Sequence, residues 1–202
     1  MSDNHLDSWK NDAVASKQLD LNKTELISHN YPPHWEFILQ HIAPIVTIDT
    51  KVLDIGCGTG SMCKLLVDNV GVCPKNYTGV DYSEQAINLA KQNYEGDFLV
   101  MNYKDLSPCY VSGFDIVISS ALTNVLPNGD ECLEFILSLQ SKALFLLKIL
   151  TTSGVSHYTE YMAYDIIPTY RYEHNINNLA DLVNRYHYNI LGSTDTNFYL
   201  KL

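Results

Sequence analysis

The sequence predicts a doubly wound α/β domain built on a seven-stranded, mostly parallel sheet, with one antiparallel strand near the C-terminal edge. Short apolar runs alternate with helical patterns along the chain, as repeated strand–helix units require. The last two runs are only a hairpin apart, which favours an antiparallel pair at the edge. The expected strands are residues 51–55, 78–81, 98–101, 114–119, 143–148, 188–191 and 198–202.

Helices are expected between the strands because apolar residues recur there at helical spacing. Cys132, Phe135, Ile136 and Leu139 lie at positions i, i+3, i+4 and i+7, which places them on one face of a helix. The segment 179–186 repeats this pattern.

The N-terminal part of the chain differs from the rest. Residues 1–30 are polar with sparse apolar positions, and residues 1–45 are expected to form a helical cover over a single globular unit of residues 46–202. Pro32 and Pro33 precede a helical segment at 34–43, where proline is tolerated because the first N–H groups of a helix have no partner.

The composition limits the classes of function. The chain has 202 residues, with 13 basic and 23 acidic side chains and a formal net charge of −10. Nucleic-acid binding depends on Lys and Arg, so no nucleic-acid partner is predicted and a small molecule is the preferred substrate. The five cysteines are scattered without the spacing of zinc ligands, so no metal site is predicted.

The location follows from what the N-terminus and the apolar runs lack. No apolar run approaches the ~20 residues of a membrane span, and residues 1–5 do not begin a signal pattern. A cytoplasmic protein with no membrane partner is therefore expected. The oligomeric state cannot be predicted from the sequence.

A glycine-rich turn follows the first expected strand. Gly56, Gly58 and Gly60 allow a sharp strand-to-helix turn and a close approach of the backbone to a ligand. Asp54 precedes the first glycine; its carboxylate would repel a pyrophosphate but can accept a hydrogen bond from an ammonium group. Asp81, about twenty residues further on, is placed to accept two ribose hydroxyls. The G-x-G-x-G spacing therefore fits a ligand that joins adenosine to an amino acid better than it fits NAD.

Residues 52–60 and 79–83, together with the strand order, resemble the class I S-adenosylmethionine-dependent methyltransferase family, whose fold is Rossmann-like. The resemblance implies S-adenosylmethionine as cofactor and S-adenosylhomocysteine as product. It implies that the three glycines form a backbone cradle for the methionine and ribose parts. Asp81 would then bind the ribose, with Tyr82 beside the adenine.

The same resemblance implies further cofactor contacts. Asn102 occupies the place where the family often has an acid that reads the adenine amino group, and Tyr103 would flank the ring. Ser119, which ends the fourth expected strand, would lie near the sulfonium. The complete set of cofactor-binding candidates is Asp54, Gly56, Cys57, Gly58, Gly60, Asp81, Tyr82, Asn102, Tyr103 and Ser119.

The methyl acceptor is less defined. Family members that methylate nucleobases or glutamine carry Asn/Asp-Pro-Pro-Tyr after the fourth strand, whereas this chain has Ser-Ser-Ala-Leu at 119–122. Aromatic candidates for the substrate pocket are Trp9, Trp35, Tyr158 and Tyr161. The alternative is that these rings only pack the cover onto the sheet.

A general base is needed only for an acceptor that arrives protonated, so no catalytic residue is assigned. His34, His157 and His174 are weak candidates. Two other functions stay open: a non-catalytic S-adenosylmethionine-binding or scaffold module, and an NAD-dependent oxidoreductase, which the glycine spacing disfavours.

Overall fold

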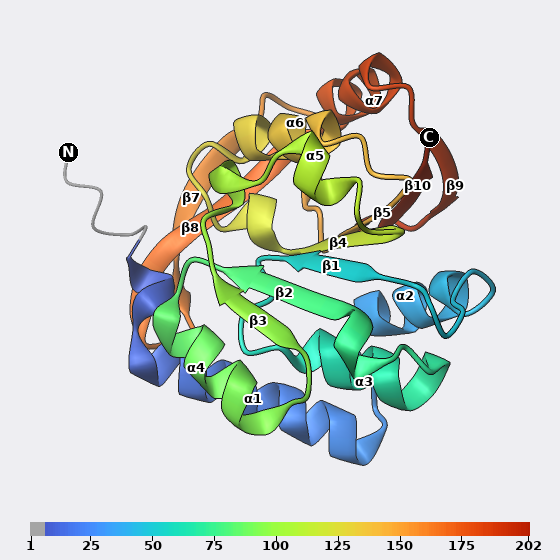
Figure 1. Ribbon diagram of the computed structural model, residues 1–202. Coiled ribbons are helices and arrows are strands. Elements are labelled where there is room, and N and C mark those ends of the chain that lie inside the picture. Colours follow the sequence, from blue (N-terminus) through green and yellow to red (C-terminus); the bar gives the residue numbers. More distant parts are fainter. Residues whose placement is uncertain (1–6) are drawn as a thin grey trace.

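The computed structural model describes residues 7–202 and contains the expected seven-stranded sheet (Figure 1). The strand order is β3-β2-β1-β4-β5-β10-β9. β10 runs antiparallel to β5 and β9, whereas β1, β2, β3, β4 and β5 pair in parallel, so the predicted topology is confirmed. The strands are β1 (Val52–Ile55), β2 (Tyr77–Asp81), β3 (Asp97–Val100), β4 (Ile116–Ser120), β5 (Ala143–Leu147), β9 (Asn189–Ser193) and β10 (Phe198–Lys201).

Helices cover both faces of this sheet (Figure 1). They are α1 (Asp12–Ser28), α2 (Pro33–Ile42), α3 (Ser61–Val70), α4 (Glu84–Asn93), α5 (Pro108–Val111), α6 (Gly129–Ser138) and α7 (Ile176–Arg185). Four short 3-10 turns connect them: η1 (Ser8–Lys10), η2 (Pro74–Asn76), η3 (Tyr103–Asp105) and η4 (Leu122–Asn124). Within residues 7–202, no helix combines the length and the apolar character needed to cross a membrane.

Each face of the sheet has its own apolar core. Ile38, Leu65 and Ile87 bring α2, α3 and α4 into one cluster of buried side chains. Leu133 and Leu182 bring α6 and α7 into the other. Burial of these side chains on opposite faces holds the sheet between two helical layers.

The register of the parallel strands brings their carboxyl ends to one edge of the sheet. Ile55 of β1 lies beside Val80 of β2 and Ser119 of β4. Ser120 of β4 lies beside Leu147 of β5. The loops that follow these four strands therefore meet in one place, the usual ligand crevice of an open α/β sheet.

The segment after β5 forms a second sheet, although no strand is expected from the sequence between residues 148 and 188. This sheet has the order β6-β8-β7, with β6 (Thr151–Thr152), β7 (His157–Ala163) and β8 (Ile167–Asn175). Six of the seven residues of β7 are exposed. Apolar and polar residues do not alternate along this strand, so the sequence lacks the usual strand pattern. Its turn uses Tyr164 and Asp165 in the left-handed region, with φ of 52° and 60°, where glycine or asparagine is the usual signal.

The N-terminal segment is attached to this second sheet. The Ser8 hydroxyl donates to the carbonyl oxygen of Pro168 over 2.6 Å, and the Trp9 indole N–H donates to the Thr169 hydroxyl over 3.1 Å. Both acceptors belong to β8. The two bonds fix η1 beside the carboxyl ends of the main sheet, at the side where Figure 1 shows β7 and β8.

Close packing at Gly129 gives a test of the junction between α6 and β8. A Cβ atom there would lie 2.4 Å from the Thr123 carbonyl oxygen and 2.4 Å from the Tyr172 ring. We expect Gly129→Ala to lower the free energy of unfolding by about 1–3 kcal/mol, because neither the backbone nor the buried ring can move freely. Urea unfolding measures this change.

Gly154→Ala is the matched control. The atom nearest to its added Cβ is the Thr152 hydroxyl oxygen at 3.5 Å, so the free energy of unfolding should change by no more than about 0.5 kcal/mol. Equal losses in the two variants would contradict the packing explanation.

Candidate functional site

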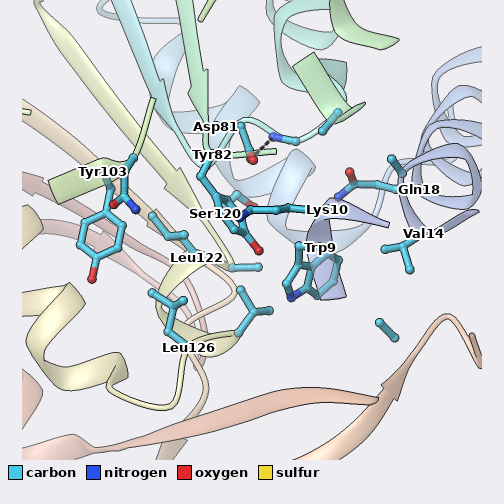
Figure 2. Close-up of a pocket in the computed structure, with 18 of the residues that line it drawn as sticks. Trp9, Lys10, Val14, Gln18, Asp81, Tyr82, Tyr103, Ser120, Leu122 and Leu126 are labelled. Carbon is cyan, nitrogen blue, oxygen red and sulfur yellow. Dashed lines mark hydrogen bonds between the residues drawn. The ribbon is translucent and has the colours of Figure 1, made fainter. Parts of the chain in front are cut away.

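A cavity of about 570 Å³ lies at the carboxyl ends of the parallel strands. Side chains from η1, α1, the β1–α3 turn and the ends of β2, β3 and β4 converge on it, and β7 contributes Tyr161 and Ala163 (Figure 2). A second cavity of about 220 Å³ adjoins it. Gln18, Gly56, Ser120, Ala121, Lys148 and Tyr164 line both.

The glycine turn shapes the main cavity. Gly56, Gly58 and Gly60 have φ of 77°, 53° and 80°, a conformation that residues with a Cβ rarely adopt. A Cβ on Gly56 would lie 3.2 Å from Leu122, and one on Gly58 would lie 2.7 Å from the Gln18 side-chain oxygen. Gly56 and Gly58 line the main cavity, so their small size keeps it open.

Gly60, the third glycine of the turn, has a packing role. Gly60 lines neither cavity; its added Cβ would meet Phe98 at 2.8 Å and Ala90 at 2.9 Å. It therefore serves the packing of the turn against β3 and α4 and makes no contact with the predicted cofactor space.

Asp81, the last residue of β2, lines the main cavity. One of its oxygens accepts from the Gly58 N–H and the other from the Ser83 N–H, each over 2.9 Å (Figure 2 shows the first). Burial raises the pKa of Asp81, and these backbone hydrogen bonds oppose the rise. The Ser83 hydroxyl accepts from the Ala86 N–H and caps α4, so capping this helix is not the role of Asp81.

Asp54 lines the second cavity together with Cys57. The Tyr77 hydroxyl donates to its Oδ2 over 2.5 Å. Its Oδ1 has no hydrogen-bond partner among residues 7–202. Burial raises the pKa of Asp54 to about 7; the Tyr77 hydrogen bond opposes the rise and the charge of Asp81 adds to it.

Tyr82, Asn102 and Tyr103 line the part of the main cavity beyond Asp81. The ammonium of Lys10 lies 5.4 Å from the centre of the Tyr82 ring, which brings η1 over this region (Figure 2). The Asn102 side-chain oxygen accepts from the Lys104 N–H over 3.0 Å. The amide oxygen of Asn102, which is expected to accept a hydrogen bond from a ligand amino group, therefore already accepts one from the backbone.

Ser120 lines the cavity, whereas the sequence predicts Ser119 there. Ser119 is buried, its hydroxyl has no partner among the described residues, and it lines neither cavity. Ser120 lines both. Successive side chains of a strand point to opposite faces, so an expectation one residue out of register selects the wrong face.

The four aromatic candidates separate into two groups. Trp9 and Tyr161 line the main cavity, and Trp35 lines the second while also packing in the core. Tyr158 is 51 % exposed, lines neither cavity and packs edge-on against Tyr170 at 5.1 Å between ring centres. Tyr158 is therefore not a residue of this pocket.

Of the three histidine candidates, His34 alone lines a cavity, the second one. Burial, and to a smaller extent the charge of Lys148, lower the pKa of His34 to about 3. His157 is exposed on β7 and contacts the Val155 carbonyl oxygen. His174 is fully buried. Neither His157 nor His174 lines either cavity, so the structure does not bring these two candidates to this site.

Several cavity residues carry no signal in the sequence. Lys10 and Gln18 come from the polar N-terminal segment, Leu122 and Leu126 from the stretch after β4, and Lys148 from the end of β5. Each is an ordinary residue type outside any motif, and only the tertiary fold brings it to the site.

A family model described as a methyltransferase domain matches residues 47–164, more than half of the chain. The ribosomal protein L11 methyltransferase of Burkholderia thailandensis is 35% identical over 91 residues, 45% of this chain and 28% of that protein. Its counterpart in Paraburkholderia phymatum is 31% identical over 94 residues, 46% of this chain and 30% of that protein. The match thus spans less than a third of the length of either relative.

Solved methyltransferase structures share the fold. The magnesium protoporphyrin IX methyltransferase of Synechocystis PCC 6803 with bound S-adenosylmethionine has a TM-score of 0.58 at 16% identity, over 82% of this chain and 76% of that one. A sugar N-methyltransferase from Streptoalloteichus has a TM-score of 0.59 at 11% identity, over 83% of this chain and 86% of that one. Together with the family model, the glycine turn and the strand order, this likeness removes the oxidoreductase alternative: the chain belongs to the methyltransferase-domain family, among the class I S-adenosylmethionine-dependent methyltransferases.

Proposed function

We propose that this chain binds S-adenosylmethionine in the main cavity and transfers its methyl group to a small-molecule acceptor. The observation that carries the proposal is the placement of Gly56, Gly58 and Asp81 around one cavity of about 570 Å³. A volume of this order suits a ligand of the cofactor's size with room to spare.

The residues present fit the cofactor. Gly56 and Gly58 leave open the space that a Cβ would fill, and Asp81 offers its carboxylate to ribose hydroxyls. Asp54 has one buried oxygen without a protein partner, which suits the ammonium group of the methionine part. S-Adenosylmethionine would supply the reactive methyl group on its sulfonium, so the protein needs chiefly to bind, orient and exclude water.

The acceptor side is proposed to lie under η1 and β7. Trp9, Leu122, Leu126 and Tyr161 give this part of the cavity a largely apolar wall. The hydrogen bonds of Ser8 and Trp9 to β8 hold this wall in place. An apolar wall with a few polar groups is typical of small-molecule sites, and the net charge of −10 disfavours a nucleic-acid acceptor.

Proton removal is not assigned to His34. With its pKa lowered to about 3, its imidazole is neutral near pH 7 but only weakly basic. His34 therefore gives no support to an acceptor that needs a general base.

The first test of the proposed function concerns Asp81. We expect calorimetry to show binding of S-adenosylhomocysteine to the wild-type chain, and Asp81→Ala to weaken it by about 1.5–3 kcal/mol, the worth of a charge-assisted hydrogen bond. Asp68→Ala removes an exposed carboxylate on α3 that pairs with Lys64, and should leave the affinity unchanged. No binding to the wild type at high micromolar concentration would contradict the proposed function.

The second prediction concerns pH. With the pKa of Asp54 at about 7, the carboxylate ionises between pH 6 and 8. The affinity for S-adenosylhomocysteine should therefore rise about tenfold over this range, because the ionised form alone pairs with an ammonium group. Asp54→Asn should abolish the dependence. A wild-type affinity that does not vary with pH would exclude this role for Asp54.

The third prediction concerns the acceptor. When the chain is incubated with an extract of the source cells and S-adenosylmethionine labelled in its methyl group, we expect label in the low-molecular-mass fraction. Heat-inactivated protein is the control. Label in protein or RNA would contradict a small-molecule acceptor, and no transfer beside intact cofactor binding would favour the scaffold alternative.

A further inference from the structure

The second cavity contains a lysine that the glycine turn and the ribose site do not require. Lys148 follows β5 directly and lines both cavities, so it lies where they join. Lys148 is exposed where it lines these cavities. The protein atoms around its ammonium still lower its pKa, and the negative charge of Glu25, which also lines the second cavity, opposes this. None of the salt bridges formed by residues 7–202 includes Lys148.

The backbone of Lys148 is held in an uncommon conformation. Its φ is 59°, in the left-handed region that favours glycine. The Lys148 N–H donates to the Asn197 side-chain oxygen over 3.0 Å, and the Asn124 side-chain amide donates to the Lys148 carbonyl oxygen. Two asparagine side chains thus clamp Lys148 through hydrogen bonds to its backbone N–H and its backbone carbonyl oxygen. Strained backbone fixed in this manner is typical of functional positions.

A chain of polar contacts supports the clamp from the far side. Nδ1 of the buried His174 lies 2.7 Å from Asp130, and its Nε2 lies 3.0 Å from the Thr123 hydroxyl. This hydroxyl lies 3.3 Å from the side-chain oxygen of Asn124. His174, predicted from the sequence as a possible base, is therefore linked through Thr123 to Asn124, whose side-chain amide donates to the Lys148 carbonyl oxygen.

The other charges around the junction show what Lys148 can bind. His34 faces the same cavity but is neutral, since its pKa lies at about 3. Asp54 and Glu25 supply negative charge in the second cavity, which suits an ammonium group, whereas Lys148 supplies the positive charge. A carboxylate is the ligand group that an accessible ammonium without an ion-pair partner recognises best.

We propose that Lys148 binds a carboxylate group at the junction of the two cavities. The inference rests on the proposed function, because the ligand that brings the carboxylate is a participant in methyl transfer. Two sources have this chemistry: the carboxylate of the cofactor's methionine part, and a carboxylic acid that serves as methyl acceptor.

The first arm of the test measures binding of S-adenosylhomocysteine and of its decarboxylated form by calorimetry. If the cofactor is the source, Lys148→Met should weaken binding of S-adenosylhomocysteine about 10- to 100-fold and leave that of the decarboxylated form unchanged. Lys148→Arg should restore much of the loss because it keeps the charge. Lys142→Met is the matched control, since this exposed lysine precedes β5 and pairs with Asp115.

The second arm titrates acetate into the protein saturated with S-adenosylhomocysteine, with acetamide as neutral control. If the acceptor is the source, acetate should shift the backbone amide resonances near Lys148 in the wild type and not in Lys148→Met, and acetamide should shift neither. Lys148→Asn serves as a second charge-removing variant, because asparagine tolerates the left-handed backbone.

Either pattern supports the proposal and identifies the source. Wild-type behaviour of Lys148→Met and Lys148→Asn in both arms would overturn it. Failure of the wild type to bind S-adenosylhomocysteine would count against the proposed function instead, and acetate titration of the cofactor-free protein would still test Lys148.

Discussion

The site depends on one backbone constraint: the chain must turn away sharply at the carboxyl ends of β1, β4 and β5. Each of these ends uses the left-handed region, with φ of 77° at Gly56, 62° at Ala121 and 59° at Lys148. At β1 a glycine adopts it without steric cost. At the other two ends, hydrogen bonds hold it: the Ala121 N–H donates to the Leu147 carbonyl oxygen over 2.9 Å, and two asparagines fix Lys148.

This constraint explains which parts could be predicted from the sequence. The central strands β1, β4 and β5 follow from apolar runs, since burial between two helical layers demands them. The turn at Gly56 follows from residue type. Ala121 and Lys148 carry no such signal, because their conformation is imposed by partners distant in the sequence. The β7–β8 hairpin was missed for the same reason: Tyr164 and Asp165 take left-handed conformations without glycine, and the exposed β7 shows no apolar alternation.

The site residues follow the same division. Asp54, Gly56, Gly58 and Asp81 were found at the cavities because they sit at fixed offsets from a recognisable turn. An assignment that depends on the face of a strand is wrong if it is one residue out of register. Ser119 was expected at the cavity but is buried, and the next residue, Ser120, faces the cavity. No motif in the sequence fixes the position of a histidine. His34 alone lines a cavity, whereas His157 is exposed and His174 is buried.

The proposed cofactor side and acceptor side of the cavity share the same parts of the chain, which has a consequence for specificity. The glycine turn and Asp81 lie within residues 47–164, the part that matches the methyltransferase family. Trp9, Lys10 and Gln18 lie outside it, on a segment fixed to β8 by two hydrogen bonds. Leu122, Leu126 and Tyr161, which complete the proposed acceptor wall, lie within residues 47–164. The N-terminal segment also reaches the cofactor side, where Lys10 lies over the Tyr82 ring. Under the proposed function, a change in either segment would therefore affect donor binding as well as acceptor choice, and Lys148, at the junction, is placed to serve either.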